Sequence, residues 1–242
     1  MNRYHLPTSE WNGQTLCLTG EEARHATRVM RVKVGEQLEL FDGCGKSAVC
    51  TVTQAERSAV YTEIQSEKNH PAPRFPVTLC QSIPKGGNME LIVQKAVELG
   101  VNAIQPLITQ RTVARSDALA KKQEKWQRIA LEACKQCGQN YLPEVATPLD
   151  FQSWIEPLDI FDTPIIASLD KQAVHLKEHL QKAPFAGSIG LLIGPEGDFT
   201  PEEYAQAYSA GFQPMSFGNI IMRVETASIY GLSIIQHELS FA

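Results

Sequence analysis

Four short runs in which hydrophobic and polar residues alternate with period two lie between residues 14 and 66. Turn residues separate the runs, among them Gly20, Gly35 and the pair Asp42-Gly43. Because successive side chains of a strand point to opposite faces, this alternation gives each run one apolar face. The pattern predicts the strands of a small barrel or sandwich, over residues 14–18, 37–41, 48–52 and 59–64.

A helix is predicted within this region, beginning near Thr19. Arg24, Arg28 and Arg31 follow at spacings of four and three, which places them along one face of an α-helix. The region ends in residues 69–76, which contain three prolines. Because proline disfavours both a helix and a central strand, we expect a first domain over residues 1–70 and a linker over residues 71–76.

Beyond the linker the pattern changes to strands that alternate with helices. Apolar runs predict strands over residues 77–83, 103–108, 164–169, 189–193 and 213–217. Helical spacing and capping residues predict helices over residues 88–99, 116–138, 200–211 and 227–238. Strands that alternate with helices are typical of an α/β fold with a parallel sheet. We therefore expect a second, α/β domain over residues 77–242.

Composition narrows the class of protein further. The chain has 242 residues, of which 43% are hydrophobic and 20% are charged. A chain of this length buries roughly 70–75% of its unfolded surface, which excludes a disordered protein and a disulfide-stapled miniature. No apolar run reaches the ~18 residues of a membrane span, and the first residues have none of the apolar run of a signal peptide. We therefore expect a soluble, cytoplasmic protein whose six cysteines are reduced thiols.

The formal net charge of −5 does not by itself indicate a protein that binds nucleic acid. Two clusters of basic residues oppose this overall charge. One cluster, residues 111–135, has seven basic residues against three acidic ones. The other consists of four residues with no acidic residue between them: Arg24, Arg28, Arg31 and Lys33. Both clusters are candidate polyanion patches, and the alternative is that they are ordinary solvent-exposed faces.

The sequence motifs that resemble a metal site or a nucleotide site each lack residues that such a site needs. Cys134 and Cys137 have the spacing of half a zinc site, but they lie within a predicted helix and have no second pair of Cys or His residues. The Gly-Lys-Ser at residues 45–47 resembles the end of a phosphate-binding loop, but Leu40 stands where that loop needs a glycine. We therefore expect a simple turn at residues 45–47 and no bound metal.

Two segments that follow predicted strands are candidates for one binding site. The strand that ends at Ile193 leads into Gly194-Pro-Glu-Gly197, whose glycines permit positive φ and a close approach of the backbone to a ligand. The second segment, residues 217–227, presents a glycine and an apolar stretch, followed by three polar residues: Arg223, Glu225 and Thr226. Parallel α/β sheets place their ligands at the carboxyl ends of strands, where both segments begin.

These segments, Ile193-Gly-Pro-Glu-Gly-Asp-Phe-Thr200 and Phe217-Gly-Asn-Ile-Ile-Met-Arg-Val-Glu-Thr-Ala227, resemble the paired motifs of the RsmE family of SPOUT methyltransferases. The resemblance extends over nearly the whole chain, including Lys85, Arg111 and residues 24–31, 40–43, 94–101 and 125–138. It implies an N-terminal PUA-like β-barrel that binds RNA and a C-terminal trefoil-knotted α/β domain that forms a homodimer. It also implies methyl transfer from S-adenosylmethionine to N3 of a uridine in the 16S ribosomal RNA of the small subunit.

The resemblance implies that both segments enclose the adenine of S-adenosylmethionine. The residues expected to bind this cofactor are Leu169, Ile193, Gly194, Pro195, Glu196, Gly197, Phe217, Gly218, Ile220, Ile221, Met222, Thr226 and Ala227. Three residues depart from the family's pattern. Asp198 replaces a glycine, and Phe217 and Met222 replace leucines. The last two keep an apolar wall, and we expect Asp198 to point to solvent or to cap the following helix.

Uracil N3 carries a proton near neutral pH, so its methylation requires removal of that proton and stabilisation of the resulting anion. We expect Arg223 to stabilise the anion, and Glu196 or Glu225 to act as a base or to orient a loop. The alternative is that Arg223 and Glu225 only form a structural salt bridge. The residues expected to bind RNA are Arg3, Arg24, Arg28, Arg31, Lys85, Arg111 and Arg115.

Three alternatives accompany these expectations. The arginines near residue 24 are either an RNA contact or the partners of Glu21 and Glu22 in salt bridges. Two other classes of protein are alternatives to a methyltransferase. A non-catalytic RNA-binding protein is disfavoured by the intact Arg223-x-Glu-Thr-Ala227 motif. A hydrolase is disfavoured because the sequence has no Ser/His/Asp or metal-binding constellation. For the homodimer, we expect contacts from one side of the last helix, formed by Ile229, Leu232 and Ile235.

Overall fold

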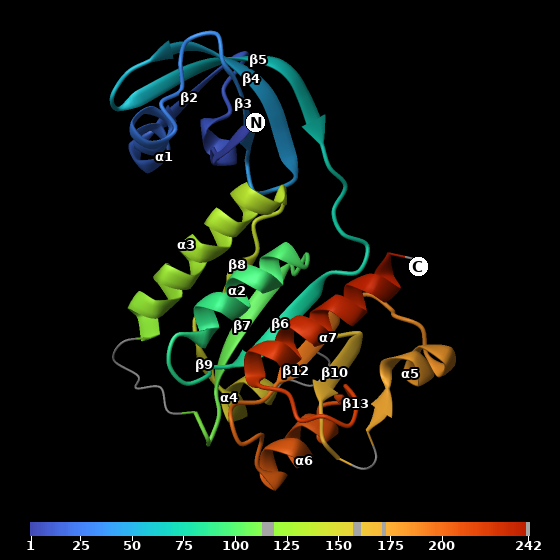
Figure 1. Cartoon of the computed structure of the whole chain (residues 1–242). Coiled ribbons are helices and arrows are strands. Elements are labelled where there is room, and N and C mark those ends of the chain that lie inside the picture. Colours follow the sequence, from blue (N-terminus) through green and yellow to red (C-terminus); the bar gives the residue numbers. More distant parts are fainter. Residues whose placement is uncertain (113–118, 157–160, 171–172, 241–242) are drawn as a thin grey trace. The chain divides into compact units, whose positions relative to one another are not determined.

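The computed structural model describes residues 1–112, 119–156, 161–170 and 173–240 (Figure 1). Contacts within the chain divide it into two units. The first contains Met1–Ala72 together with Cys134–Leu142, and the second contains Pro73–Ala133 together with Pro143–Ala242. None of the helices in the described ranges has the length and apolarity that crossing a membrane requires.

The first unit is built on a five-stranded sheet with the strand order β1-β3-β4-β5-β2. Its strands are β1 Asn2–His5, β2 Thr15–Thr19, β3 Gln37–Phe41, β4 Lys46–Ala55 and β5 Ala59–Asn69, and a short 3-10 helix, η1, spans Thr8–Glu10. All pairs are antiparallel except β1 with β3. The four predicted strands are confirmed, whereas β1 was missed because four residues give too short an alternation.

Alternation of side chains explains the core of this sheet. Leu16 and Leu18 of β2 are buried, while Cys17 between them is partly exposed. Leu38 and Leu40 of β3 repeat the pattern, and Tyr4 of β1 is fully buried beside them in the same cluster. The apolar face expected from the sequence is therefore the inner face of the sheet.

The helix that carries the first arginines is irregular. Helix α1, Gly20–Arg24, continues as a single π-helical turn, η2, His25–Val29, in which the amide of Met30 donates to the carbonyl of His25. Arg31 follows outside this turn with φ 55°. The prediction that one α-helical face carries all three arginines is therefore wrong for Arg31, because the wider turn ends the helix before that residue.

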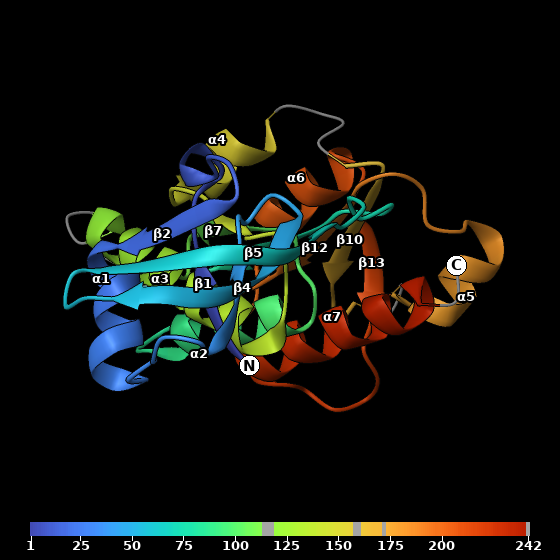
Figure 2. The ribbon, with the colours of Figure 1, turned by 90° about the horizontal axis from the view of Figure 1, so that it is seen from above.

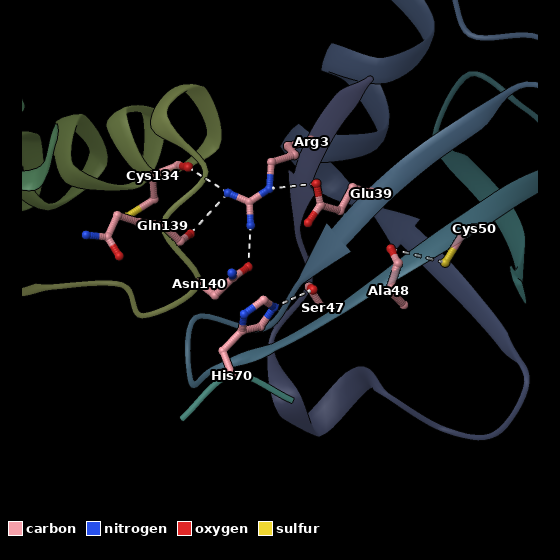
Figure 3. Close-up of polar contacts among 9 residues, drawn as sticks. All are labelled: Arg3, Glu39, Ser47, Ala48, Cys50, His70, Cys134, Gln139 and Asn140. Carbon is pink, nitrogen blue, oxygen red and sulfur yellow. Dashed lines mark hydrogen bonds and ion pairs between the residues drawn. The ribbon is translucent and has the colours of Figure 1, made fainter. Parts of the chain in front are cut away.

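The segment Cys134–Leu142 belongs to the first unit, although the sequence placed it in the second domain. Arg3 of β1 explains this, because its guanidinium donates to the carbonyls of Cys134 and Gln139 and to the side chain of Asn140 (Figure 3). Tyr141 adds a bond from its hydroxyl to the carbonyl of His70, at 2.9 Å. Sequence periodicity cannot show that a helix end is bound by a residue about 130 positions earlier.

The second unit is built on an eight-stranded parallel sheet with the order β11-β13-β10-β12-β6-β7-β8, in which β9 also pairs with β7. Its strands are β6 Val77–Ser82, β7 Ala103–Ile108, β8 Glu144–Val145, β9 Leu149–Asp150, β10 Thr163–Ala167, β11 Val174–His175, β12 Ile189–Ile193 and β13 Gln213–Ser216. All five predicted strands of this region are confirmed. The short strands β8, β9 and β11 were missed, since two residues leave no period to detect.

Helices cover both faces of this sheet (Figures 1 and 2). The helices of the unit are α2 Asn88–Glu98, α3 Leu119–Cys137, α4 Phe151–Ile155, α5 Leu176–Lys182, α6 Pro201–Ser209 and α7 Val224–Leu239. Helices α2 and α7 lie on one face and α4 and α6 on the other (Figure 2). This explains why every residue of the central strand β12 is buried, as the continuous apolar run in its sequence predicts.

One predicted helix start is not tested by the structure, and another differs from the prediction. The predicted N-cap of α3, Ser116, lies outside the described residues, and α3 is described from Leu119 onward. Helix α7 begins at Val224, three residues earlier than predicted, with Arg223 as its N-cap. Glu225 therefore lies in the first turn of α7 and not in a loop.

Candidate functional site

A cavity of about 680 Å³ lies in the second unit, at the carboxyl ends of β10, β12 and β13. Its walls come from the three segments that follow these strands, from the start of α7 and from Asn88 at the start of α2. The lining residues are Asn88, Ala167, Ser168, Leu169, Ile193, Gly194, Pro195, Glu196, Gly197, Asp198, Phe217, Gly218, Ile220, Ile221, Met222, Arg223, Val224, Glu225 and Ala227. The two segments singled out in the sequence thus meet in one cavity.

Of the residues expected to bind a cofactor, twelve line this cavity and Thr226 does not. Thr226 lies in the first turn of α7 and is exposed, because the earlier start of the helix turns it away from the cavity. The sequence missed Asn88 and Ser168. Ser168 was detectable in principle, since it follows the predicted strand over residues 164–169 at the same edge of the sheet.

The two glycines of the turn after β12 have different roles, and only one of them has the positive φ that the sequence predicted for both. Gly197 has φ 94° and Asp198 has φ 69°, whereas Gly194 does not have a positive φ. A Cβ on Gly194 would instead lie 3.1 Å from Asp198 Oδ1 and 3.2 Å from the ring of Phe199. Close packing therefore favours glycine at 194, because a larger residue would displace these side chains, and the expectation of positive φ there is wrong.

Asp198 neither points freely to solvent nor caps α6, so that expectation is wrong as well. Thr200 is the N-cap of α6 and forms the predicted capping box with Glu203. The carboxylate of Asp198 accepts from the amide of Phe199 at 2.9 Å and from the hydroxyl of Tyr204 at 2.8 and 2.9 Å. Burial and the charge of Asp198 raise the pKa of Tyr204 well above its usual range, so this hydroxyl stays a donor.

The three candidate catalytic side chains all line the cavity. Both oxygens of Glu196 accept from the amide of Lys85 at 3.1 Å, and one oxygen of Glu225 accepts from Asn88 at 3.3 Å. Arg223 is exposed, and among the described residues no ion pair joins it to Glu225. The alternative of a structural salt bridge between Arg223 and Glu225 is therefore not what the structure shows.

Two residues of the β7–α3 connection bind the segment after β12, one at the turn itself and one at the first turn of α6. The guanidinium of Arg111 donates to the carbonyls of Gly197, Asp198 and Phe199. Next to it, the amide of Gln110 donates to the buried carboxylate of Glu203 at 2.8 Å. Only Nη1 of Arg111 makes these bonds and the residue is exposed, so its expected contact with RNA stays a prediction.

The remaining residues expected to bind RNA differ in how exposed they are. The side chain of Arg3 is only 8% exposed and also pairs with Glu39 at 3.2 Å, so Arg3 is not available to RNA (Figure 3). Arg24, Arg28, Arg31 and Lys85 are exposed, and no ion pair of the described chain involves them. Arg115 lies outside the described residues.

Glu22 is not a partner of these arginines. Its carboxylate pairs with Lys135 at 2.8 Å and accepts from the amide of His5. Glu21 is exposed, and the ion pairs found in the described ranges do not include it. The alternative in which Glu21 and Glu22 neutralise the arginine cluster is therefore not supported.

The fold and the cavity define a ligand-binding α/β protein with an appended β-sheet unit that exposes basic residues. Two family descriptions match the chain: an RNA methyltransferase domain over residues 70–236 and an RNA methyltransferase PUA domain over residues 18–65. The chain belongs to this RNA methyltransferase family, as the resemblance of its motifs suggested.

Named relatives and solved structures agree with this assignment. The chain is 34% identical over 221 residues to ribosomal RNA small subunit methyltransferase E of Synechocystis, which covers 90% of this chain and 72% of that protein. Its Bacillus subtilis counterpart is 29% identical and covers 98% and 97%. The crystal structure of the Neisseria gonorrhoeae enzyme bound to S-adenosyl methionine has a TM-score of 0.88 at 35% identity and covers 98% and 97% of the two chains.

Proposed function

We propose that this chain transfers the methyl group of S-adenosylmethionine to N3 of a uridine in the 16S ribosomal RNA of the small subunit. The observation that carries the proposal is the cavity formed by the two motif segments, in a chain whose relatives are named for methylation of small-subunit ribosomal RNA. Two structural neighbours contain the bound methyl donor. The place of action that fits this substrate is the cytoplasm.

The cavity fits a nucleoside-sized ligand. Its volume lies within the roughly 300–1,000 Å³ typical of small-molecule sites, and its walls are mainly apolar with a few polar groups. Ile220 and Ile221 are 79% and 77% exposed beside the cavity, so they are free to contact the faces of an adenine ring. Gly194 and Gly197 leave backbone groups accessible to its polar edge.

When bound, S-adenosylmethionine supplies a methyl group on a positively charged sulfur. Transfer requires that N3 of the uracil loses its proton and uses the freed electron pair to bind the methyl carbon, while the pair of the carbon–sulfur bond remains on sulfur. Arg223, at the N-cap of α7 and on the cavity wall, provides a cation for the uracil anion. Holding N3 in line with the methyl group supplies a further part of the acceleration.

The two candidate bases differ in their hydrogen bonds. Both oxygens of Glu196 accept from one backbone amide, which favours a role in orienting the turn. Glu225 accepts only one side-chain bond, from Asn88, and its second oxygen has no hydrogen-bond partner among the described residues. We therefore assign the role of base to Glu225 and the orienting role to Glu196.

RNA binding by the first unit rests on its exposed cations. Arg24, Arg28 and Arg31 are exposed around the π-helical turn, together with the apolar side chains of Val29 and Met30. Guanidinium groups bind phosphates, and exposed apolar side chains contact unstacked bases. In the second unit, exposed Lys85 adjoins the cavity through the bond of its amide to Glu196 and is the corresponding candidate there.

A homodimer and a trefoil knot in the second unit are parts of the same proposal. The prediction of which side of α7 meets a partner is wrong, because Leu232 and Ile235 are buried within the chain itself. Exposed Tyr230 on α7, with Leu169 and the two isoleucines beside the cavity, offers the apolar surface for a second copy. Light scattering at micromolar concentration tests this, and a fully active monomer would contradict it.

The proposed function is tested by calorimetry with S-adenosylmethionine, followed by methylation of small ribosomal subunits that lack the modification. We expect binding of one cofactor per chain and the appearance of N3-methyluridine in the RNA. Absence of cofactor binding would contradict the proposal. Binding without methyl transfer to any subunit preparation would favour the non-catalytic RNA-binding alternative.

A further inference from the structure

Asp198 brings a carboxylate to the wall of the cavity where a glycine would have none. The residue adopts φ 69°, a conformation that favours glycine, and its side chain folds back toward the start of the turn. Asp198 Oδ1 lies 3.1 Å from the position that a Cβ on Gly194 would occupy, and both residues line the cavity. The charge therefore lies at the wall and not in the surrounding solvent.

The direction of this carboxylate is fixed by two donors. The hydroxyl of Tyr204, on α6, bonds both oxygens, and the amide of Phe199 bonds Oδ1. Phe199 is buried in the cluster beneath the sheet, and the rings of Phe199 and Tyr204 contact each other with centroids 5.5 Å apart. A packed core thus holds the carboxylate in one orientation without neutralising it.

The lining as a whole carries more negative than positive charge. Glu196, Asp198 and Glu225 contribute three carboxylates, while Arg223 contributes one guanidinium. The bonds to these carboxylates come from backbone amides, an amide side chain and a phenol, all of which are neutral donors. In the part of the chain that the structure describes, no ion pair involves any of the three.

Methyl transfer changes the charge of the cofactor by one unit. The donor carries a sulfonium in addition to an ammonium and a carboxylate, so its net charge is +1, whereas the thioether that remains is neutral overall. The two molecules are otherwise nearly identical in shape. A negative wall is therefore a means of distinguishing them, because only the donor gains the additional attraction.

We propose that Asp198 is a specificity-determining residue that makes the site prefer the cationic methyl donor to its neutral thioether product. This rests on the proposed function. The consequence is weaker product inhibition than a glycine at this position would allow, because the spent cofactor loses part of its attraction to the wall once the methyl group has left.

The test compares the dissociation constants of S-adenosylmethionine and S-adenosylhomocysteine, measured by calorimetry on the parent protein and on Asp198→Asn. Asparagine keeps the size of the side chain and an oxygen that accepts from Tyr204, but removes the charge. We expect the preference for the donor, expressed as the ratio of the two constants, to fall roughly three- to tenfold. This is the size that Coulomb's law gives for the attraction of two unit charges across a partly hydrated site.

Three further measurements separate charge from shape. Sinefungin, in which a protonated amine replaces the methyl sulfonium, is expected to lose affinity in Asp198→Asn as the donor does. Glu202→Gln removes the same charge from an exposed position in the first turn of α6, outside the cavity lining, and is expected to leave the ratio unchanged. Asp198→Gly is expected to reproduce the effect of asparagine.

Three outcomes are distinguishable. An unchanged ratio in both Asp198 variants overturns the inference. If the unchanged ratio is accompanied by an equal loss of affinity for donor and product, the result also assigns Asp198 to positioning of the turn alone. If the parent protein binds neither molecule, the proposed function itself fails, which the parent measurement reveals before any variant is compared.

Discussion

A cluster of positive charge in the first unit and a mainly negative cavity lining in the second unit lie in different settings. In the first unit, Arg24, Arg28 and Arg31 are exposed around an irregular helix and have no ion-pair partner among the described residues. In the second, three carboxylates and one guanidinium line a cavity. A net charge of −5 describes neither region. The proposed contacts with RNA and with a cationic cofactor therefore depend on the local distribution of charge and not on its sum.

Sheet topology explains part of this contrast. In the parallel sheet of the second unit, all strands end at one edge, so the segments after β10, β12 and β13 meet and enclose a cavity. In the mainly antiparallel sheet of the first unit, successive strands end at opposite edges. The arginines proposed to contact RNA lie instead in and just after the helical connection between β2 and β3.

The largest effect is expected at the turn after β12. Gly194→Val is expected to lower the affinity for S-adenosylmethionine by at least about 100-fold, since a branched side chain there meets Asp198 and the ring of Phe199 and displaces the turn. Calorimetry measures the loss. Gly87→Ala is the matched control, because a Cβ at Gly87 has no neighbour within 4 Å, and it is expected to bind like the parent. Parental affinity in Gly194→Val would mean that the turn is not part of the binding site.

The second effect concerns the cation of the cavity. Arg223→Ala is expected to lower kcat about 100- to 1,000-fold with little change in cofactor affinity, because the cation is needed mainly when the uracil anion forms. Steady-state methylation assays on ribosomal subunits measure it. Arg223→Lys should recover part of the rate. Unchanged turnover in the alanine variant would exclude this role, and the charges of the two units would then no longer differ in function as proposed.

The third effect separates the arginines of the first unit. Arg3→Ala is expected to reduce the free energy of unfolding by about 2–4 kcal/mol, because it leaves Glu39 and several acceptors of a nearly buried site without their donor. Denaturant unfolding measures the loss. The salt dependence of RNA binding should remain parental in this variant. If the Arg3→Ala protein is as stable as the parent but its RNA binding depends differently on salt, Arg3 contacts RNA after all.

The smallest effect in free energy is expected for the exposed cluster. Replacing Arg24, Arg28 and Arg31 by glutamine should leave stability and cofactor affinity unchanged, and should reduce the slope of log K for RNA against log salt by up to about 0.7–0.9 per lost phosphate contact. Binding titrations at several salt concentrations provide the slope. Equal slopes with a lowered melting temperature would assign these arginines to structure.

Sequence periodicity predicted the long elements of both units and the two segments that line the cavity. It failed where the cause lies far away in the chain or in local geometry. Apolar spacing placed the start of α7 three residues too late, so Thr226 was expected beside the cavity, whereas it lies in the first turn of the helix. The sequence shows the charge of Arg111 but not the bonds of this residue to carbonyls 86 to 88 residues later, so its contact with the turn was missed.

Asp198 shows the limit of motif comparison. The departure from glycine was visible, but its consequence required the position of Tyr204, whose hydroxyl orients the carboxylate. Gly194 shows the same limit in reverse, since the residue was identified correctly for the wrong physical reason. Residue type indicates which chemistry is available, and packing decides where it is directed.

The bonds from Arg3 to Cys134 and Gln139 also constrain the order in which the chain folds. The side chain near the start of the chain is separated from these acceptors by 131 and 136 residues. At about 5–20 residues per second, a ribosome needs roughly 7–26 s to synthesise the intervening chain. During this interval the β-sheet of the first unit can form, but its arginine anchor cannot. A nascent chain released before residue 142 would therefore carry an incomplete N-terminal unit, even though all five of its strands are present.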